Sequence, residues 1–220
     1  MPTPTPSETL IVVSDTICPW CFIGKRRLEG ALTQLASEGL HFELEWRPFQ
    51  LNPDMPDDGA ERTAYRTAKF GSLAKSQAMD KQVADVGQEV GIGFRYDLIT
   101  RTPNTLASHV MIADALRAGG PALQNRAVEA LFQAYFVEGQ DVGRTEVLRS
   151  IARDVGFDHG PSVNAALWEL VEAQDVDARQ EGIRGVPSVI LGQQLLFSGA
   201  QPSDVMAQIL RDAVAEAATG

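Results

Sequence analysis

The two cysteines of the 220-residue chain, Cys18 and Cys21, are separated only by Pro19 and Trp20. Two thiols at this spacing can close a small-ring disulfide within the chain, and a thiolate can open or form that disulfide through a mixed disulfide with a second molecule. The spacing therefore points first to thiol–disulfide exchange, with Cys18 as the nucleophile and Cys21 as the resolving thiol.

The elements around this dithiol predict which thiol reacts first. Residues 10–13 form a short β-branched run typical of a buried strand, and an apolar stripe from Cys21 onward predicts a helix that ends near Gly39. Pro19 suits the first turn of such a helix. A helix N-terminus stabilises an anion, so we expect Cys18 to be the exposed nucleophile in its thiolate form. Trp20 adds no positive charge that would stabilise the thiolate further. We therefore expect a weaker oxidant than a CxxC protein whose thiol pKa is about 3.5.

Two other roles for the cysteines stay open. A CxxC can supply half of a zinc site, but a closed site needs about four ligands, and the chain has no further cysteine and only three scattered histidines. Two buried structural cysteines are the second alternative, although that role gives no reason for a position between a strand and a helix. The redox dithiol is favoured because a CxxC beside a βαβ pattern is a specific signal.

Pro187 lies in the segment Gly185-Val186-Pro187-Ser188, directly before a second β unit. In the simpler interpretation this proline only starts an edge strand. Together with the dithiol, the segment order instead predicts a cis peptide bond that brings the backbone of Val186 beside the cysteines. The N–H and C=O of Val186 could then pair with an extended substrate polypeptide.

The hydrophobic pattern along the chain predicts an α/β thioredoxin-type order, β-α-β and β-β-α, interrupted by a large all-helical insertion. A strand over residues 41–47 would run parallel to the first strand. We expect a disordered lead-in at 1–8, the first part of the fold at 9–53, the insertion at 54–178 and the second part at 179–220. Helices are expected near 60–90, 104–118, 122–138, 144–155 and 161–178, strands at 186–191 and 194–198, and a last helix from about 202.

Composition limits the partners. The chain is 44% hydrophobic and 22% charged, which is ordinary for a globular protein with a core. Its net charge of −10 disfavours nucleic acid and anionic membranes as partners. The first residues show neither a basic region nor an apolar run of the kind that a secretory signal needs, so the expected location is the cytoplasm.

Further positions carry a family resemblance. They are Asp15-x-x-Cys18-Pro19-Trp20-Cys21-x-x-Gly24, Phe49-x-Leu51-Asn52-Pro53, Asn104-Thr105-x-x-x-His109, Ala130-Leu131-Phe132-x-Ala134-Tyr135-Phe136, Gly185-Val186-Pro187-Ser188 and Gly199-Ala200-Gln201. With them the chain resembles the DsbA-like branch of the thioredoxin superfamily and, within it, the FrnE-type dithiol oxidoreductases, over about residues 10–214. The resemblance implies a thioredoxin fold split by a helical domain, exchange through Cys18 with Cys21 resolving, and a cis Pro187 facing the dithiol.

Three other residues are candidates for the active-site loop and groove. The resemblance implies that Asn104 and His109 face the groove. The alternatives are that Asn104 caps a helix and that His109 is a core histidine. Asp15 precedes Cys18 by three residues and could orient the loop or cap the turn, and its charge, if close, would disfavour a thiolate.

Three functions compete at this stage. The first is a DsbA-like dithiol–disulfide oxidoreductase acting on protein or small-molecule thiols and disulfides, with no cofactor beyond its redox-active disulfide and with glutathione as an optional co-substrate. The second is a glutathione-dependent isomerase or transferase of the 2-hydroxychromene-2-carboxylate isomerase or kappa-class type, which usually keeps no resolving cysteine. The third is a binding module or chaperone. With only two cysteines the first cycle needs an external redox partner, and the oligomeric state stays open.

Overall fold

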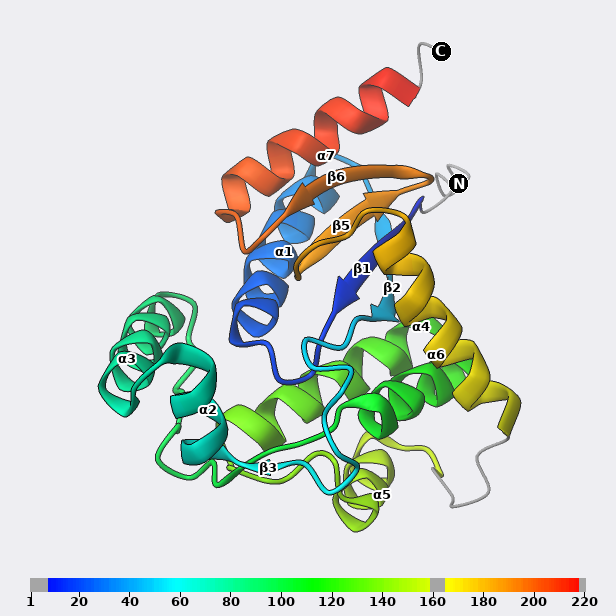
Figure 1. Cartoon of the computed structure of the whole chain (residues 1–220). Coiled ribbons are helices and arrows are strands. Elements are labelled where there is room, and N and C mark those ends of the chain that lie inside the picture. Colours follow the sequence, from blue (N-terminus) through cyan, green and yellow to red (C-terminus); the bar gives the residue numbers. More distant parts are fainter. Residues whose placement is uncertain (1–7, 159–164, 218–220) are drawn as a thin grey trace.

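The computed structural model describes residues 8–158 and 165–217, and its chain forms a mixed sheet embedded among helices (Figure 1). The elements, in chain order, are β1 (Glu8–Ser14), α1 (Pro19–Ser37), β2 (Phe42–Pro48), β3 (Ala60–Glu61), α2 (Arg62–Phe70), α3 (Leu73–Glu89), β4 (Arg101–Thr102), α4 (Leu106–Phe136), α5 (Thr145–Val155), α6 (Ala165–Gln180), β5 (Ser188–Leu191), β6 (Gln194–Ser198) and α7 (Ser203–Ala217).

The main sheet has the strand order β2-β1-β5-β6 and confirms the predicted split of the fold. β1 pairs in parallel with β2, with Leu10 opposite Leu44, and antiparallel with β5, with Val12 opposite Val189. β1 is an inner strand, and its C-terminal residues Val12, Val13 and Ser14 are buried, so both faces are buried at that end. Leu10 and Val12 belong to one apolar cluster, and Val13 belongs to another on the opposite face.

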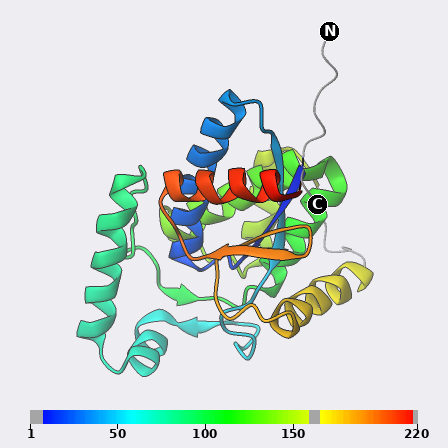
Figure 2. The same ribbon diagram turned by 90° about the horizontal axis from the view of Figure 1, so that it is seen from above.

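Helices cover both faces of this sheet. α1 and α7 pack together over the face that Leu10 and Val12 present, whereas α6 lies over the other face, where Ala178 joins the cluster of Val13 (Figures 1 and 2). The C-terminal half of the central strand is thus shielded from water on both sides, and it leads directly into the dithiol loop. This arrangement gives the loop a rigid support.

The insertion joins the sheet along the β2 edge. The side-chain amide of Gln124 in α4 accepts a hydrogen bond from the Trp46 N–H and donates one to the Trp46 carbonyl, each at 2.9 Å. An unpaired edge strand would otherwise expose both groups. The Trp46 indole also donates to Asn125 at 3.1 Å. Side chains of α4 therefore take the place of a further strand.

A second contact fixes α1 on α4. Phe22, which is fully buried, stacks on Phe132 with ring centroids 5.1 Å apart and lies 6.2 Å from Phe136. Beside this stack, the buried ammonium of Lys25 lies 2.9 Å from a carboxylate oxygen of Glu129. Burial acts to raise the pKa of Glu129, but Lys25 and hydrogen bonds with its neighbours lower it overall, so the contact is ionic.

Several expected boundaries need correction. The insertion is not all helical, because β3 and β4 form a small antiparallel pair. The helix expected over 60–90 is two helices, since Gly71 adopts a left-handed φ of 86° and Ser72 caps the next helix. By contrast, the break expected between the helices near 104–118 and 122–138 is confirmed. The span labelled α4 consists of two helical parts, because Gly119 and Gly120 both leave the helical conformation and Gly120 has a left-handed φ of 71°.

The ends of the predicted segments also shift. Glu8 already belongs to β1, so the lead-in is shorter than 1–8, and residues 1–7 and 161–164 lie outside the described residues. α6 continues to Gln180, past the expected boundary at 178, and β5 starts at Ser188 rather than at 186. In the part of the chain that is described, no helix is both long and apolar enough to span a bilayer.

Candidate active site

Cys18 is the N-cap residue of α1. Its backbone is extended, with φ −91° and ψ 109°, and Pro19 begins the helix, as the sequence predicts. The Cys18 N–H donates to the Asp15 carbonyl at 3.0 Å, and the Cys18 carbonyl accepts from the Cys21 N–H at 3.0 Å. These bonds close the turn between β1 and α1 and fix the direction of the Cys18 side chain.

The expected exposure of Cys18 is wrong, because only 4% of the residue is exposed. The reason lies 168 positions further along the chain, where the Val186 carbonyl accepts a hydrogen bond from the Cys18 thiol at 3.7 Å. Val186 lies against the sulfur at the edge of a neighbouring cavity. Cys18 and Val186 both line that cavity.

Cys21 occupies a different environment, one helical turn further into the core. It is fully buried, and burial, together with a hydrogen bond and the charge of Cys18, raises the pKa of its thiol well above the ordinary value, although a hydrogen bond with Ser14 opposes the shift. Both thiols are free in this structure. The two sulfurs are thus unequal, one at a cavity wall and the other sealed behind it.

The Val186–Pro187 peptide bond is cis, which confirms that expectation. The Pro187 carbonyl accepts a hydrogen bond from the Gly199 N–H at 2.7 Å, and this ties the loop to the end of β6. On the side of α1, a Cβ added at Gly24 would lie 2.8 Å from the Pro187 ring. Gly24 therefore allows the Pro187 ring to lie directly against the helix that carries the cysteines.

A cavity of about 300 Å³ lies in front of Cys18. Its near wall includes Cys18, Pro19, Trp20 and the Gly185–Val186 segment, and its far wall comes from α2, α3 and the start of the insertion. Trp20 is 37% exposed, so its indole is available to a ligand as well as to solvent. The residues that line the cavity are Ile17, Cys18, Pro19, Trp20, Leu51, Asn52, Arg62, Tyr65, Arg66, Lys69, Phe70, Met79, Asp80, Val83, Tyr96, Ile99, Thr102, Tyr135, Phe136, Gly185 and Val186.

The cationic side chains in the far wall were not foreseen from the sequence. Arg62 and Arg66 both donate to the carboxylate of Asp80, at 2.7 and 2.6 Å. Lys69 donates to Asn52 Oδ1 and to the Tyr65 hydroxyl, each at 2.7 Å. Positions 62, 65, 66 and 69 have the i, i+3, i+4, i+7 spacing of one helix face, and this polar stripe is the signal that could have identified them.

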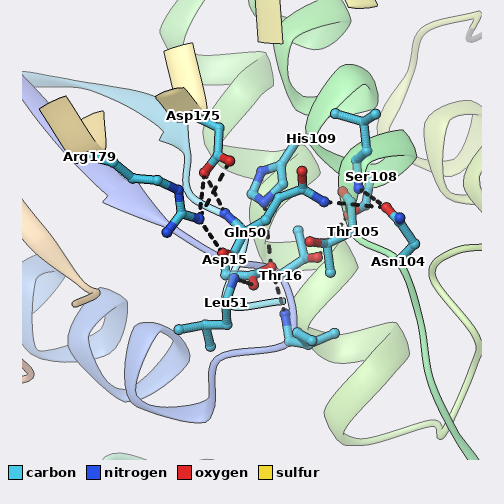
Figure 3. Close-up of polar contacts among 12 residues, drawn as sticks. Asp15, Thr16, Gln50, Leu51, Asn104, Thr105, Ser108, His109, Asp175 and Arg179 are labelled. Atoms are coloured by element: carbon cyan, nitrogen blue, oxygen red, sulfur yellow. Dashed lines mark hydrogen bonds and ion pairs between the residues drawn. The ribbon is translucent and has the colours of Figure 1, made fainter. Parts of the chain in front are cut away.

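Asp15 and His109 lie in a buried polar network behind the dithiol and do not line the cavity (Figure 3). The Asp15 carboxylate accepts from the Leu51 N–H at 2.7 Å and from the Ile17 N–H at 3.5 Å. Its other close neighbour is His109 Nε2, 3.4 Å from Oδ1, although Nε2 makes no hydrogen bond among the described residues. These contacts fit the interpretation that Asp15 orients the loop.

Asn104 also lies outside the cavity lining, at the start of α4. Its side-chain oxygen accepts from the Leu106 N–H at 2.9 Å, which supports the capping alternative. Its amide nitrogen donates to the Met55 carbonyl at 2.7 Å, and Gln50 donates to its oxygen at 3.3 Å (Figure 3). Asn104 therefore fastens the loop after β2 to the insertion.

Metal binding finds no support in the described segments, 8–158 and 165–217. No group of three or more His, Cys, Asp or Glu side chains in them is arranged to hold a metal ion. Both cysteines and His109 lie within these segments. Among the described residues, the zinc alternative therefore has no set of ligands.

Comparisons with known proteins agree with this architecture. A family model described as a DSBA-like thioredoxin domain matches residues 9–211. The uncharacterized protein YwbO of Bacillus subtilis (strain 168) is 27% identical over 208 residues, which are 91% of this chain and 94% of YwbO. The crystal structure of the probable DsbA oxidoreductase SCO1869 from Streptomyces coelicolor is 28% identical with a TM-score of 0.81, covering 95% of this chain and 91% of the other.

A more distant structure shares the fold alone. The cytosolic disulfide reductase DsbM from Pseudomonas aeruginosa is 17% identical with a TM-score of 0.65, and the match covers 94% of this chain and 98% of that one. Because these matches span nearly the whole chain, they include the helical insertion as well as the thioredoxin-type sheet.

Proposed function

The chain belongs to the family of DSBA-like thioredoxin domains, and from this we propose that it is a thiol–disulfide oxidoreductase whose cycle passes through Cys18 and Cys21. The observation that carries the proposal is the unequal placement of the two sulfurs. Cys18 lies at the N-terminus of α1 and lines a cavity, whereas Cys21 is fully buried behind it. This is the division of labour that a nucleophile and a resolving thiol require.

The proposed cycle uses only these two sulfurs. The Cys18 thiolate attacks one sulfur of a substrate disulfide, forms a mixed disulfide and releases the other sulfur as a thiolate. Cys21 then gives up its proton and attacks the Cys18 sulfur, which releases the second substrate thiol and leaves a Cys18–Cys21 disulfide. The substrate gains two electrons and two protons, and the protein dithiol loses them. In the opposite direction the same steps oxidise a dithiol.

Val186 is proposed to hold the substrate during exchange. Val186 lines the cavity, and its carbonyl oxygen lies 3.7 Å from the Cys18 sulfur. When Cys18 is ionised or bonded to a substrate, that carbonyl loses its thiol donor. A backbone N–H on the substrate could then take its place, as in strand addition.

The dithiol cycle is tested with a Cys18→Ser and a Cys21→Ser variant. Cys18→Ser should abolish exchange with a model disulfide, whereas Cys21→Ser should accumulate a Cys18 mixed disulfide that mass spectrometry detects. Both serines are nearly isosteric with the thiols, and circular dichroism provides the folding control. Exchange that survives in Cys18→Ser would contradict the assignment.

A glutathione-dependent isomerase or transferase remains the second candidate, because the cavity is bounded by helices as well as by the dithiol loop and has room for a small molecule. There the protein would activate a bound thiol and would not need a resolving cysteine. Turnover that persists in Cys21→Ala and is lost in Cys18→Ala favours this route over the dithiol cycle.

The cycle also defines the partner. Cys18 and Cys21 are the only cysteines, so electrons must enter or leave through another molecule. We propose a cytoplasmic setting, in which the external partner is a reducing thiol, and membership of the FrnE-type subgroup. The reduction potential of the pair, obtained by equilibration with glutathione buffers, sets the direction of exchange and tests this setting.

A further inference from the structure

We infer that the α2 side of the cavity is a binding site for the carboxylate groups of a small acidic disulfide, and that such disulfides are preferred substrates over neutral or cationic ones. This inference rests on the proposed function and adds the chemical class of the substrate.

The first argument is charge. The cavity lining contains three cationic side chains, Arg62, Arg66 and Lys69, but a single carboxylate, that of Asp80. The cavity wall therefore carries a formal charge of +2, although the whole chain carries −10. A concave, partly desolvated surface concentrates such a potential, and it attracts anions from solution.

The second argument is that one carboxylate serves two guanidinium groups. The side chains of Arg62, Arg66 and Asp80 are only 14%, 19% and 13% exposed, so water screens this triad weakly. Burial and the like charge of Arg62 lower the pKa of Arg66 despite the attraction of Asp80. A second carboxylate, brought by a ligand, would relieve this excess of positive charge.

The third argument is an unused hydrogen-bond donor. The Tyr96 hydroxyl is buried and makes no hydrogen bond among the described residues, although Tyr96 lines the cavity and the Arg62 guanidinium lies 5.3 Å from its ring. Burial keeps this phenol protonated, because it raises the pKa of Tyr96 far above the ordinary value. A buried donor of this kind favours a ligand that brings an acceptor oxygen.

Lys69 is the cation most available to such a ligand. It is exposed, and among the described residues its ammonium donates hydrogen bonds to the neutral groups of Asn52 and Tyr65. Apolar side chains also line the cavity, among them Phe70, Val83 and Phe136, and they can contact the methylene groups of a short acid. The cavity, at about 300 Å³, is of the size of small-molecule sites.

The test compares three short symmetrical disulfides that differ in charge. They are 3,3′-dithiodipropionate, which is a dianion, 2-hydroxyethyl disulfide, which is neutral, and cystamine, which is a dication. The pre-reduced protein is mixed with each, and the second-order rate constant for oxidation of its dithiol is measured. Each rate constant is divided by the one that the same disulfide shows with a small free dithiol, which removes differences in intrinsic reactivity. We expect this ratio to be highest for the dianion, and we expect added salt to lower it.

Variants then assign the preference to the α2 wall. Lys69→Gln should lower the rate with the dianion by about threefold to fivefold, the range of a solvent-accessible ion pair, and Lys69→Glu should lower it further. The matched control is Lys75→Gln, which removes the same charge from an exposed position on α3 outside the cavity lining. Equal losses in Lys69→Gln and Lys75→Gln, or equal rates with all three disulfides, would overturn the inference.

A second readout does not depend on turnover. The ratio of Cys18 alkylation rates with iodoacetate and iodoacetamide compares an anion with a neutral molecule at the same sulfur. This ratio should fall by about threefold in Lys69→Gln and stay unchanged in Lys75→Gln. If the ratio falls but no disulfide is reduced, the anion site stands and the proposed exchange function fails. If exchange proceeds and the ratio does not change, exchange stands and the anion site is refuted.

Discussion

The two walls of the cavity are built in different ways. The wall that carries the cysteines is continuous with the central strand β1 and with the buried aromatic stack of Phe22, and backbone hydrogen bonds fix it. Part of the opposite wall is α2, a helix without a single buried residue, which contacts Asp80 of α3 through Arg62 and Arg66. The difference teaches that apolar packing fixes the reacting sulfurs, whereas charge shapes what can approach them.

The sharpest test of this contrast removes one aromatic ring from each wall. Phe22→Ala should lower the free energy of unfolding by about 3–5 kcal/mol, since the ring is fully buried against Phe132. Phe70→Ala on α2 should cost only about 1–2 kcal/mol, because that ring is half-buried beneath Arg66. Urea denaturation measures both values. Equal losses would show that the two walls are held by the same kind of packing.

The next test removes the carboxylate of the α2 wall. Asp80→Asn leaves Arg62 and Arg66 facing each other and should destabilise α2 locally by about 2 kcal/mol, seen as faster hydrogen exchange over residues 62–70. The rate of Cys18 alkylation by iodoacetamide should change less than about twofold, because the two walls are expected to behave as independent sites. Asp85→Asn, which breaks the exposed pair with Lys81, is the control and should cost about 0.5 kcal/mol or less. Faster exchange throughout α1 would contradict the separation of the walls.

A third prediction uses pH to compare the two sulfurs of the first wall. The pKa of Cys21 is raised chiefly by burial, and we expect this burial to persist when Cys18 is part of a mixed disulfide. Below that pKa the thiolate fraction of Cys21 rises about tenfold per pH unit, so release of the second thiol should accelerate by the same factor. Stopped-flow release of a chromophoric thiol measures this phase, which should be missing in Cys21→Ser.

The same shift affects stability. The native state holds the Cys21 proton more tightly than the unfolded chain does. The free energy of unfolding of the reduced protein should therefore be constant at neutral pH and fall as pH rises above about 8.5, the ordinary thiol value. A Cys21→Ser variant should lose this dependence. Stability that increases over the same range would contradict the direction of the shift.

Sequence patterns predicted the first wall well, because its signals are local. The β-branched run, the CxxC and the proline at the helix start lie within a dozen residues, and they place Cys18 correctly at the N-cap of α1. The burial of Cys18 was missed for the opposite reason. It depends on Val186, and no local pattern shows which distant backbone will cover a side chain.

The second wall was harder to predict. The sequence of α2 is typical of an ordinary solvated helix. Its contacts with Asp80 of α3 accompany the placement of Arg62 and Arg66 in the lining of the cavity that Cys18 also lines. The helix break at Gly71, which allows these contacts, is a single glycine within a pattern otherwise typical of one long helix. For Asn104 the local interpretation was the better guide, since its hydrogen bond to Leu106 is that of a cap.

The position of β1 between β2 and β5 has a consequence for synthesis on the ribosome. β2 can pair with β1 early, but β5 begins only at Ser188, so one edge of an apolar strand must wait for its partner. At about 5–20 residues per second, that wait lasts on the order of ten seconds or longer. We expect a ribosome-bound chain that stops before residue 188 to expose the unpaired, aggregation-prone edge of β1 next to the two cysteines. Such a chain should be a client for chaperones.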